Sequence, residues 1–395
     1  MTGGDHAVEV AKLGDIAAEA GLHRVSMLAW RDLDDPEAGG SELHASNIAA
    51  LWAEAGIEVT MRTSYAAGHP QVSWRDGYRV IRKAGRYLVF PRGAFSEMMG
   101  WHGGRDGLIE IWNGMPFFSP LWSRTAHVTW LHHVHAEMWQ MTLPPRLAAF
   151  GNFVESKLAP PLYHHTPIVT LSESSKRELV DDLGFRADRV SVVTPGIDAH
   201  YTPGGEKSPT PLVVAVGRLV PVKQFDVLID ALVALKPTHP DLEAVIVGEG
   251  YKREELESQL HAARAESWIR LPGHVGEDEK VDLYRRSWIL ASASAREGWG
   301  MTITEAAACG TPAVVSDVAG HADAVVDGRT GVLAPDADAL RAGIDRLLGD
   351  ADLRAGMSAA AQAHASRYTW EATARGTLEV LAAASIARRR RRDGR

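Results

Sequence analysis

The sequence predicts an α/β protein with two doubly wound domains, each a parallel sheet covered by helices on both faces. The chain has 395 residues, which is beyond the size at which a single hydrophobic core keeps growing. Short runs rich in Val, Ile and Leu alternate with longer amphipathic segments, a pattern typical of parallel strands joined by crossover helices. The alternation stops at a segment rich in proline and glycine and then restarts, which indicates a linker between two domains.

The first domain is predicted to span residues 1–195. The stretch GSELHASNIAALWAEAG, residues 40–56, predicts the helix that follows the first strand. The apolar runs predict strands at 23–30, 57–63, 78–83, 106–113, 126–133, 167–172 and 189–196.

The linker is predicted at 196–210 and the second domain at 211–367. After it we expect a helix at 368–387 that packs back toward the first domain, and then a basic tail at 388–395. Within the second domain, helices are expected at 224–235 and 279–287, and strands at 211–219, 243–250, 267–275, 287–294 and 311–317.

Composition and charge exclude several classes of protein. Cys309 is the only cysteine, so a disulfide framework is excluded and a reducing compartment is expected. The first residues lack a signal-peptide pattern and no apolar run reaches the ~18 residues of a membrane span, so we expect a cytoplasmic protein. The formal net charge is -8, and this acidic balance argues against nucleic acid as a partner.

Two segments raise the question of a membrane. The run Arg388–Arg392 is expected to be part of a solvated, disordered tail, with contact to an anionic membrane surface as the alternative. The stretch 144–165 has Leu147, Phe150, Phe153, Val154 and Leu158 at helical spacing. We expect these side chains to face the core, and a lipid-facing surface is the alternative.

Two strand-to-helix loops suit a phosphate group. In EAGGSELHASN, residues 37–47, Gly39 and Gly40 let a ligand approach the backbone at a helix N-terminus, whose free N–H groups favour anions. This signal is weak alone, because Glu42 is also an ordinary helix-capping residue. In VGRLVPVKQFD, residues 216–226, Arg218 and Lys223 could clamp a diphosphate at the carboxyl end of a strand. The alternative is a pair of solvated surface charges.

A third loop carries two carboxylates. In REGWGMTITEAAACGTP, residues 296–312, Glu297 precedes a glycine-rich turn and Glu305 lies about one turn into the helix that begins near Met301. The helix N-terminus suits an anion, whereas the carboxylates suit hydroxyl groups. We therefore expect a ligand that carries both, such as a sugar and a ribose joined by phosphates.

Three histidines end a strand of the first domain. In WLHHVHAEMW, residues 130–139, His132, His133 and His135 are clustered. A contact between one of them and a ligand is the favoured interpretation. A zinc site is the minor one, because no cysteine or carboxylate pattern accompanies them. The aspartates of RDLDDPE (31–37) and PDADA (335–339) are interpreted as turn residues, so no metal site is expected.

Together these stretches resemble the retaining family 4 glycosyltransferases of the GT-B fold, in which two Rossmann-like domains face a central cleft. EGWGMTITEAAACGTP is similar to the family's E-x7-E signature, and GRLVPVKQFD to its G-R-L…K-G segment, although Gln224 stands where glycine is usual. VGEGYKREEL (247–256), SESSKREL (172–179) and GRTGVLAPD (328–336) fit as well. The similarity is strongest over 210–335 and looser in the first domain.

The resemblance implies a role for each matching residue. Arg218 and Lys223 would neutralise the diphosphate, and Glu305 would hold the ribose hydroxyls. Glu297 would hold the hydroxyls of the donor sugar. His133 would lie beside the donor sugar carbon, with His135 as the fallback and His132 as the third candidate. Further donor contacts are expected from Gly39, Gly40, His274, Val275, Gly298, Trp299, Gly300, Met301 and Thr302.

The implied activity is retaining transfer of a hexosyl unit from a UDP- or GDP-linked sugar to an unidentified acceptor, which could be a sugar, a lipid-linked molecule or a small molecule. No cofactor and no metal are expected. Two alternatives are a GT-B sugar-nucleotide epimerase and a catalytically silent homologue that serves as a binding protein. The joint presence of Arg218, Lys223, Glu297 and Glu305 argues against the silent homologue, and contact with a membrane surface is kept as a further alternative.

Overall fold

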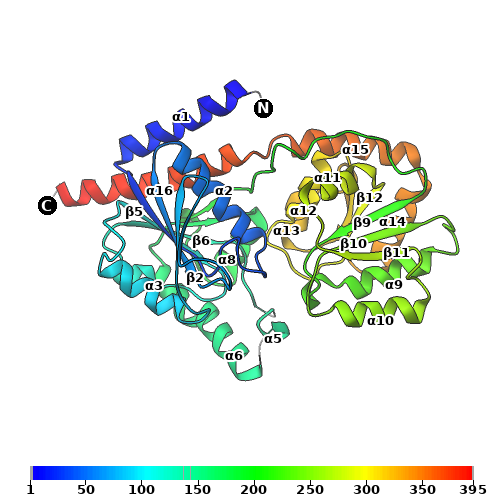
Figure 1. The fold of residues 1–395 in the computed structure, drawn as a ribbon, viewed down its shortest axis with the longest axis horizontal. Coiled ribbons are helices and arrows are strands. Elements are labelled where there is room, and N and C mark those ends of the chain that lie inside the picture. The colour runs from blue at the N-terminus through cyan, green and yellow to red at the C-terminus, as the bar shows by residue number, and fades with distance from the viewer. Residues whose placement is uncertain (1–2, 137, 143, 394–395) are drawn as a thin grey trace. The chain divides into compact units, whose positions relative to one another are not determined.

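The computed structural model describes residues 3–136, 138–142 and 144–393. The chain forms two compact units: residues 1–196 together with 369–395, and residues 197–368. Each unit has its own sheet with helices on both faces (Figure 1).

The sheet of the first unit has the strand order β3-β4-β2-β1-β5-β6-β7-β8. All neighbouring strands are parallel except β3, which pairs antiparallel with β4. The strands are β1 (Arg24–Leu28), β2 (Glu58–Ser64), β3 (Val72–Arg75), β4 (Tyr78–Ala84), β5 (Gly107–Trp112), β6 (Ala126–Leu131), β7 (Ile168–Thr170) and β8 (Val190–Val192).

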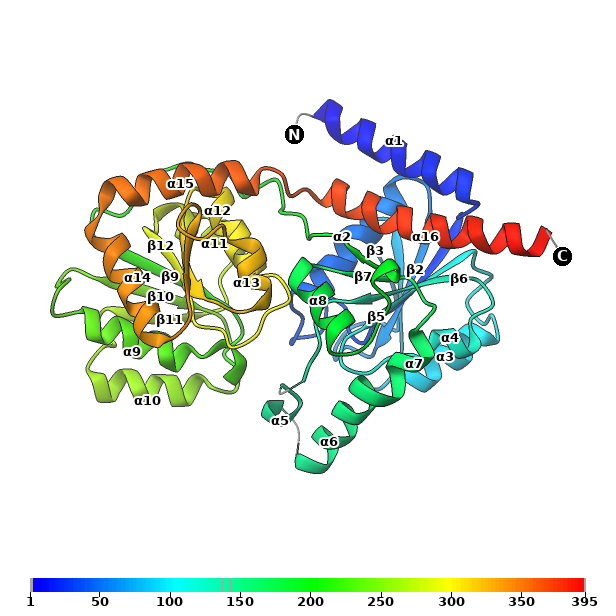
Figure 2. The same cartoon turned by 180° about the vertical axis from the view of Figure 1, so that it is seen from behind.

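The helices of the first unit cover both faces of this sheet (Figure 2). Helix α2 packs against β2 and β4, α16 packs against α1, α2 and β6, and α3 packs against β2 and β4. The helices are α1 (Gly3–Ala20), α2 (Gly40–Glu54), α3 (Val89–Met98), α4 (Ser119–Trp122), α5 (Met138–Thr142), α6 (Pro145–Phe153), the π-helix η1 (Val154–Leu158), α7 (Ala159–Tyr163), α8 (Glu173–Asp181), the 3₁₀ turn η2 (Ala187–Arg189) and α16 (Trp370–Asp393).

The second unit has a fully parallel sheet with the order β11-β10-β9-β12-β13-β14. Its strands are β9 (Leu212–Val216), β10 (Glu243–Val247), β11 (Ile269–Gly273), β12 (Ile289–Ser292), β13 (Ala313–Ser316) and β14 (Gly331–Ala334). Its helices are the 3₁₀ turn η3 (Pro221–Lys223), α9 (Phe225–Leu235), α10 (Arg253–Ala263), α11 (Glu277–Arg286), α12 (Met301–Ala308), α13 (Ala319–Ala324), α14 (Ala337–Gly349) and α15 (Ala351–Ala365).

The strands expected from the apolar runs are all present, with edges that differ by up to a few residues. Strands β3 and β14 were not predicted, and neither were several of the helices, among them α1, α3, α14 and α15. The tail prediction was wrong for residues 388–393, because they continue α16 as helix instead of forming a disordered extension. Two arginines of this run donate to backbone carbonyls of the first unit, Arg388 to Arg124 and Arg389 to Glu19. Residues 394–395 lie outside the described part.

The expectation that 144–165 faces the core was also wrong for most of its apolar residues. Val154 is buried, but Leu147, Phe150, Phe153 and Leu158 are between 44% and 57% exposed. Helix α6 extends away from the sheet of its unit in both views (Figures 1 and 2), which leaves these side chains uncovered. Within the described residues, none of the helices is both long and apolar enough to cross a membrane.

Candidate functional site

The loop between β12 and α12 is held tightly at its glycines. Gly300 has a φ of +106°, a conformation that favours glycine, and α12 begins at the next residue. Gly320 of α13 lies against the same loop, because a Cβ atom there would be 2.4 Å from the backbone nitrogen of Trp299. The first-turn N–H groups of Met301 and Thr302 therefore sit at a fixed place, and first-turn N–H groups have no partner inside a helix.

Glu297 is paired with Lys223 across two loops. The Lys223 ammonium donates to Oε1 of Glu297, and Ser294 Oγ donates to the same oxygen at 2.9 Å. Burial by itself would raise the pKa of Glu297, but the charge of Lys223, a contribution from His321 and these hydrogen bonds outweigh it and lower the pKa to about 2. Glu297 is therefore a carboxylate at every physiological pH.

Glu305, in helix α12, is the second carboxylate of the predicted donor site. Only 6% of the residue is exposed. Tyr284 donates its hydroxyl to Glu305 Oε2 at 3.0 Å, and Lys280 Nζ lies 3.9 Å from the same atom. Burial raises its pKa, and Lys280 and Tyr284 oppose that shift. The other carboxylate oxygen, Oε1, makes no hydrogen bond with the described residues, so it can accept from a ligand hydroxyl.

The loop after β9 presents the second cation. Arg218 is exposed. Its backbone carbonyl accepts from the Val220 N–H at 2.8 Å, whereas its guanidinium makes no hydrogen bond or ion pair with a described residue. A Cβ atom on Gly248 would be 1.9 Å from the carbonyl oxygen of Gly217, so the loops after β9 and β10 touch backbone to backbone. Gln224, which stands where the resemblance expects glycine, has a φ of +46°. Glycine adopts this left-handed conformation more readily than other residues, which explains why glycine is usual at this position in the family.

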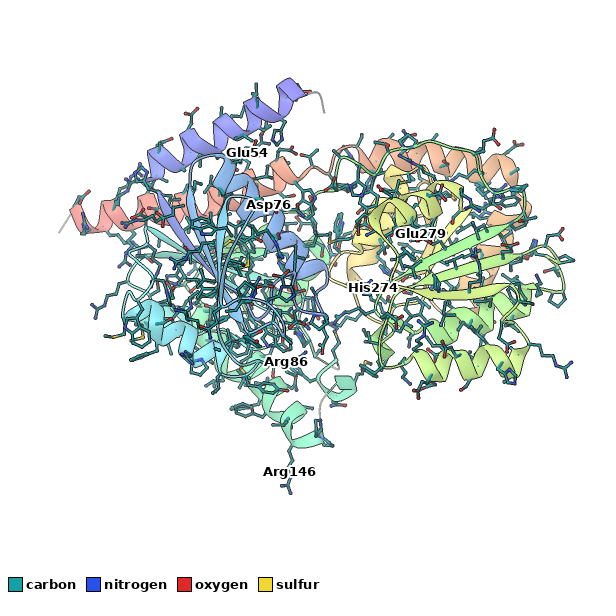
Figure 3. All side chains as sticks on the ribbon, viewed as in Figure 1. Glu54, Asp76, Arg86, Arg146, His274 and Glu279 are labelled. Atoms are coloured by element: carbon teal, nitrogen blue, oxygen red, sulfur yellow. The ribbon has the colours of Figure 1, made fainter. Side chains whose placement is uncertain are left out.

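His274 lies just beyond the carboxyl end of β11 (Figure 3), and Val275 is the next residue along the chain. His274 is exposed and Val275 is half-buried. Gly273 before them has a φ of +84°, which turns the chain as the strand ends. Their backbone groups lie in an accessible loop, as the prediction of contacts to a base requires.

In the first unit, Gly39 and Gly40 begin α2 as expected. Gly39 is the N-cap, and its backbone N–H donates to the Glu42 carboxylate at 2.8 Å. Glu42 is therefore a capping residue here, and Arg31 Nε lies 3.5 Å from its other oxygen. The interpretation of Glu42 as a helix-capping residue is therefore confirmed, whereas contact between a ligand and the backbone of Gly39 and Gly40 stays a prediction.

The three histidines after β6 have different surroundings. His132 is buried beside His44, with ring centroids 4.8 Å apart, and burial holds its pKa well below the usual value. His133 and His135 are half-buried and stack at 4.8 Å. Of the three, His132 is least suited to contact a ligand, and His133 and His135 remain candidates.

Glu155 shapes the histidine loop, and sequence reasoning missed it. It is fully buried in η1, and its carboxylate accepts the backbone N–H groups of His135 at 3.0 Å and Ala136 at 3.2 Å and the Trp139 indole N–H at 2.9 Å. One sequence signal could have found it, since it is the only acidic residue in 138–165. Ser294, Tyr284 and Lys280 were missed too, and they have no motif of their own.

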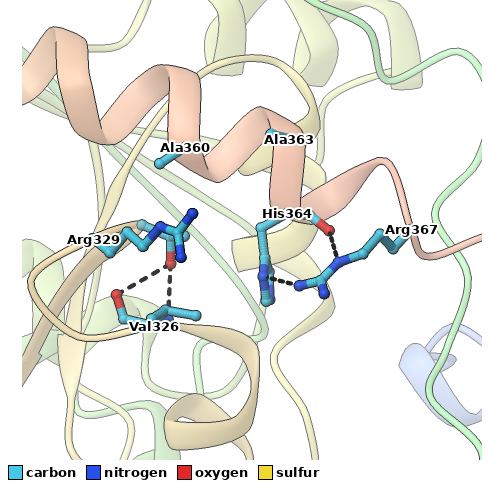
Figure 4. Close-up of a pocket in the computed structure, with 7 residues that line it drawn as sticks. Val326, Arg329, Ala360, Ala363, His364 and Arg367 are labelled. Atoms are coloured by element: carbon cyan, nitrogen blue, oxygen red, sulfur yellow. Dashed lines mark hydrogen bonds between the residues drawn. The ribbon is translucent and has the colours of Figure 1, made fainter.

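A separate cavity of about 470 Å³ lies between α15 and the loop before β14 (Figure 4). It is lined by Val326, Arg329, Thr330, Ala360, Ala363, His364 and Arg367. None of the predicted donor residues lines it. Tyr368 connects the cavity to the glycine loop, because its hydroxyl hydrogen-bonds His364 at 2.9 Å and its ring contacts the Trp299 ring.

Comparison with known proteins places these features in a family. The family model described as Glycosyl transferases group 1 matches residues 199–364, and that described as Glycosyltransferase Family 4 matches residues 38–201. A D-inositol 3-phosphate glycosyltransferase of Corynebacterium urealyticum is 33% identical over 394 residues, covering 87% of this chain and 90% of that protein. The chain belongs to the family 4 glycosyltransferases. This glycosyltransferase is also 29% identical to the Streptomyces scabiei protein of the same name, over 90% of the chain and 89% of that protein.

Solved structures show the fold of this glycosyltransferase. Sucrose-phosphate synthase from Thermosynechococcus elongatus has a TM-score of 0.77 at 18% identity, covering 90% of this chain and 97% of that one. Anabaena HepE in complex with UDP and glucose has a TM-score of 0.72 at 19% identity, covering 91% and 100%. The predictions of the family, of the GT-B fold and of a glycosyltransferase enzyme are thereby confirmed.

Proposed function

We propose that this glycosyltransferase moves a hexosyl unit from a nucleoside diphosphate sugar to its acceptor with retention of configuration and without a metal. The observation that carries the proposal is the grouping in the second unit of Lys223, Glu297 and the N-terminus of α12 with Glu305 inside that helix. Cations and free N–H groups suit a diphosphate. The two carboxylates suit the hydroxyls on either side of it.

Each group has one task in this proposal. Arg218 and Lys223 neutralise the diphosphate, and the backbone from Gly298 to Thr302 contacts the donor. Glu305 accepts from the ribose hydroxyls. Glu297 accepts from the sugar hydroxyls, and its depressed pKa keeps it an acceptor. His274 and Val275 meet the base through their backbone, and Gly39, Gly40 and His133 remain the predicted donor contacts of the first unit.

To accelerate the transfer, the protein must stabilise a nucleoside diphosphate as it departs and positive charge grows on the sugar ring. Arg218, Lys223 and the helix N-terminus stabilise the leaving charge from fixed positions, which costs no reorganisation during the reaction. Loss of one such contact lowers the rate roughly 10²–10³-fold, by analogy with an oxyanion-hole donor. Retention follows if the acceptor attacks from the face that the diphosphate leaves, with the leaving phosphate taking the acceptor's proton.

The names of similar proteins narrow the substrates. HepE was solved with UDP and with UDP-glucose, which favours a uridine nucleotide among the UDP and GDP sugars. Several relatives are named for D-inositol 3-phosphate, which favours a phosphorylated polyol as acceptor. We therefore propose UDP-hexose as the donor to test first, and inositol phosphates and sugar phosphates as the first acceptors.

Release of nucleoside diphosphate tests this proposal. We expect release from one donor to depend on an acceptor, to continue in EDTA, and to fall roughly 10²–10³-fold in Lys223→Ala, and NMR of the product to show the donor's anomeric configuration. Release of sugar or of an isomer without an acceptor would favour the epimerase. No release from any donor, with every nucleotide still bound, would favour the silent homologue.

We further propose that α6 contacts a membrane surface. Its uncovered side chains Leu147, Phe150 and Phe153 are flanked by exposed Arg146 and Lys157, and the one acidic residue of 138–165 is buried. Apolar and basic groups without acidic ones suit an anionic bilayer. We expect Phe150→Ser/Phe153→Ser to lose co-sedimentation with phosphatidylglycerol vesicles while Val8→Ser, which changes an exposed residue of α1, keeps it. Equal sedimentation of all three proteins would overturn this contact.

A further inference from the structure

Two buried arginines lie on neighbouring strands of the first unit, and only one of them is paired. Arg82 on β4 donates to Asp32 at 2.7 Å, to Ser73 Oγ at 3.0 Å and to the carbonyl of Pro70 at 3.1 Å, and it also donates to Asp34. Arg62 on β2 is 3% exposed. Its Nε and Nη1 have no hydrogen-bond partner among the described residues.

Glu97, the acidic group among the described residues whose charge acts on Arg62, is already engaged. Glu97 of α3 accepts from Arg105 at 2.6 Å. Burial lowers the pKa of Arg62, with Glu97 opposing and the charge of Arg92 adding to that shift. A buried guanidinium with unpaired N–H groups is costly, and a negatively charged group that accepts from those N–H groups would remove this cost.

The surroundings of Arg62 are cationic. In the register of β2 and β4, Arg62 pairs with Ile81 and Thr60 pairs with Arg79. Side chains alternate along a strand, so Arg62 and Arg79 share one face. Lys83 lies where the register of the two strands shifts. His102, just beyond α3, lies within the influence of these positive charges. Its pKa is lowered to about 4, mainly by burial and further by the charges of Arg62, Lys83 and Arg79.

The position of the cluster suits a ligand. Arg62 lies two residues before the end of β2, and Lys83 lies one residue before the end of β4. Ligands of open α/β sheets bind at the carboxyl ends of the parallel strands. Lys83 and Arg79 are half-buried and Arg92 of α3 is exposed, so positive charge continues from the surface to the buried Arg62.

We propose that Arg62, together with Arg79, Lys83 and Arg92, binds an anionic group of the phosphate class, and that this group belongs to the acceptor. The planar guanidinium matches two oxygens of a phosphate, and lysine adds a point charge. The assignment to the acceptor rests on the proposed function, because the donor residues of the second unit already account for the diphosphate.

Inorganic phosphate is the probe, read as the shift in Tm of the full chain at constant ionic strength. We expect phosphate at several times its Kd to raise the Tm of the wild type by roughly 2–4 °C. In Arg62→Met that rise is lost, while the Tm without phosphate is unchanged or higher, because an unpaired buried charge is replaced by an apolar side chain of similar length. Arg62→Lys keeps part of the rise.

Arg124→Met is the matched control, since Arg124 is an exposed arginine of the same unit beside the amino end of β6. It keeps the full phosphate response. An equal phosphate response in Arg62→Met and wild type would overturn the site, as would a large fall in the Tm of Arg62→Met without phosphate.

The two proposals fail separately in this design. A UDP response that survives in Arg62→Met, without any phosphate response in the wild type, overturns the anion site and leaves the donor site standing. A phosphate response that depends on Arg62, with no response to any nucleotide, overturns the donor site instead. Two ligands distinguish a soluble acceptor from a lipid headgroup as the source of the phosphate group. We expect Arg62→Met to raise the KM for a phosphorylated soluble acceptor at least 10-fold. If that KM is unchanged and the variant instead loses binding to phosphatidylglycerol vesicles, the site belongs to a lipid headgroup.

Discussion

Lys223 and Glu297 come from two different loops of the second unit, and their pairing sets the charge of the predicted donor site. Neither side chain is strongly exposed, at 23% and 17%, so each limits how the other can move. In the absence of donor the pair satisfies both charges. A bound diphosphate would compete for Lys223, which leaves Glu297 to accept from sugar hydroxyls.

This pair predicts a specific pH dependence of stability. The folded-state pKa of Glu297 is about 2, below the ordinary 4.5. The contribution of its ionised form to stability is therefore complete above about pH 4.5 and is lost as pH falls through the folded-state pKa. We expect the difference in unfolding free energy between wild type and Glu297→Gln to shrink by about 3 kcal/mol at most between pH 5.5 and pH 2. Urea unfolding of both proteins measures it, and a difference that stays constant over this range would contradict the pairing.

Gln224 predicts a gain of stability at one residue. A left-handed conformation costs a residue other than glycine roughly 1–2 kcal/mol, and glycine returns part of this as chain entropy. We expect Gln224→Gly to raise the unfolding free energy by about 0.5–1 kcal/mol, and Gln224→Val, which is β-branched, to lower it. Chemical denaturation of the two variants decides between this account and one in which the Gln224 side chain stabilises the turn.

At the scale of elements, the segment η1–α7 holds the histidine loop through a single carboxylate. Glu155 lies in a π-helix, where the widened turn places it against the backbone N–H groups of His135 and Ala136. Such π-helical turns are often found at functional sites. The shape of the loop that carries His133 thus depends on an element that sequence patterns describe only as helix.

Glu155→Gln tests this dependence. The amide keeps one acceptor oxygen but turns N–H groups toward the backbone donors, so we expect a loss of about 1–3 kcal/mol in stability and a larger fall in kcat for sugar transfer than in nucleotide affinity. Ser156→Ala is the control, because Ser156 is next along the helix and its hydroxyl donates to the carbonyl of Asn152. Wild-type kcat in Glu155→Gln would show that the loop is held by other contacts.

The elements that the sequence predicted are those with a strong period or a marked start. Strands β9 and β12 are continuous apolar runs, and α12 follows a glycine turn, so the donor loops could be placed from residue patterns alone. Strand β3 is short and partly exposed, and it carries no such pattern. The exposure of Leu147 and Phe150 also could not be predicted, because helical spacing shows which residues share a face but not what covers it.

Hydrogen bonds between side chains from different loops could not be predicted from the sequence either. Ser294 and Lys223 reach Glu297 from positions 3 and 74 residues away, and only the folded chain brings them together. The orphaned Arg62 and the paired Arg82 are both arginines within β-strands, and their different surroundings follow from the loop that carries Asp32 and Asp34. Residue type predicted the chemistry of the site, and topology decided which residues share it.

At the scale of the whole molecule, the chain returns to its first unit after completing the second. Trp52 donates its indole N–H to the carbonyl of Ala374 at 3.0 Å, Thr373 Oγ1 donates to the carbonyl of Thr194 at 2.8 Å, and Ser385 Oγ donates to the carbonyl of Ala20 at 2.9 Å. Helix α16 also buries Leu378 and Leu381. The first unit is therefore incomplete without the last residues of the chain.

Truncation of the chain tests whether the first unit depends on α16 for its stability. We expect removal of residues 369–395 to unfold the first unit, because α1, α2 and β6 lose the apolar face that covers them, while removal of 391–395 leaves Tm within roughly 2 °C. Limited proteolysis with mass analysis identifies the cleaved unit. Protection of residues 20–190 in the longer truncation would show that the first unit folds without α16.

Donor binding to the wild type and to Glu305→Gln tests the central claim most directly. Isothermal titration with UDP, UDP-glucose, GDP and GDP-mannose, each in EDTA, compares the nucleotides on the same protein. The account predicts tight binding of one nucleotide and its sugar, weakened at least 10-fold in Glu305→Gln because a carboxylate acceptor for the ribose hydroxyls becomes an amide, with the Tm of the variant close to that of the wild type. Absence of binding by every nucleotide at millimolar concentration, or an unchanged affinity in Glu305→Gln, would contradict a donor site built on α12.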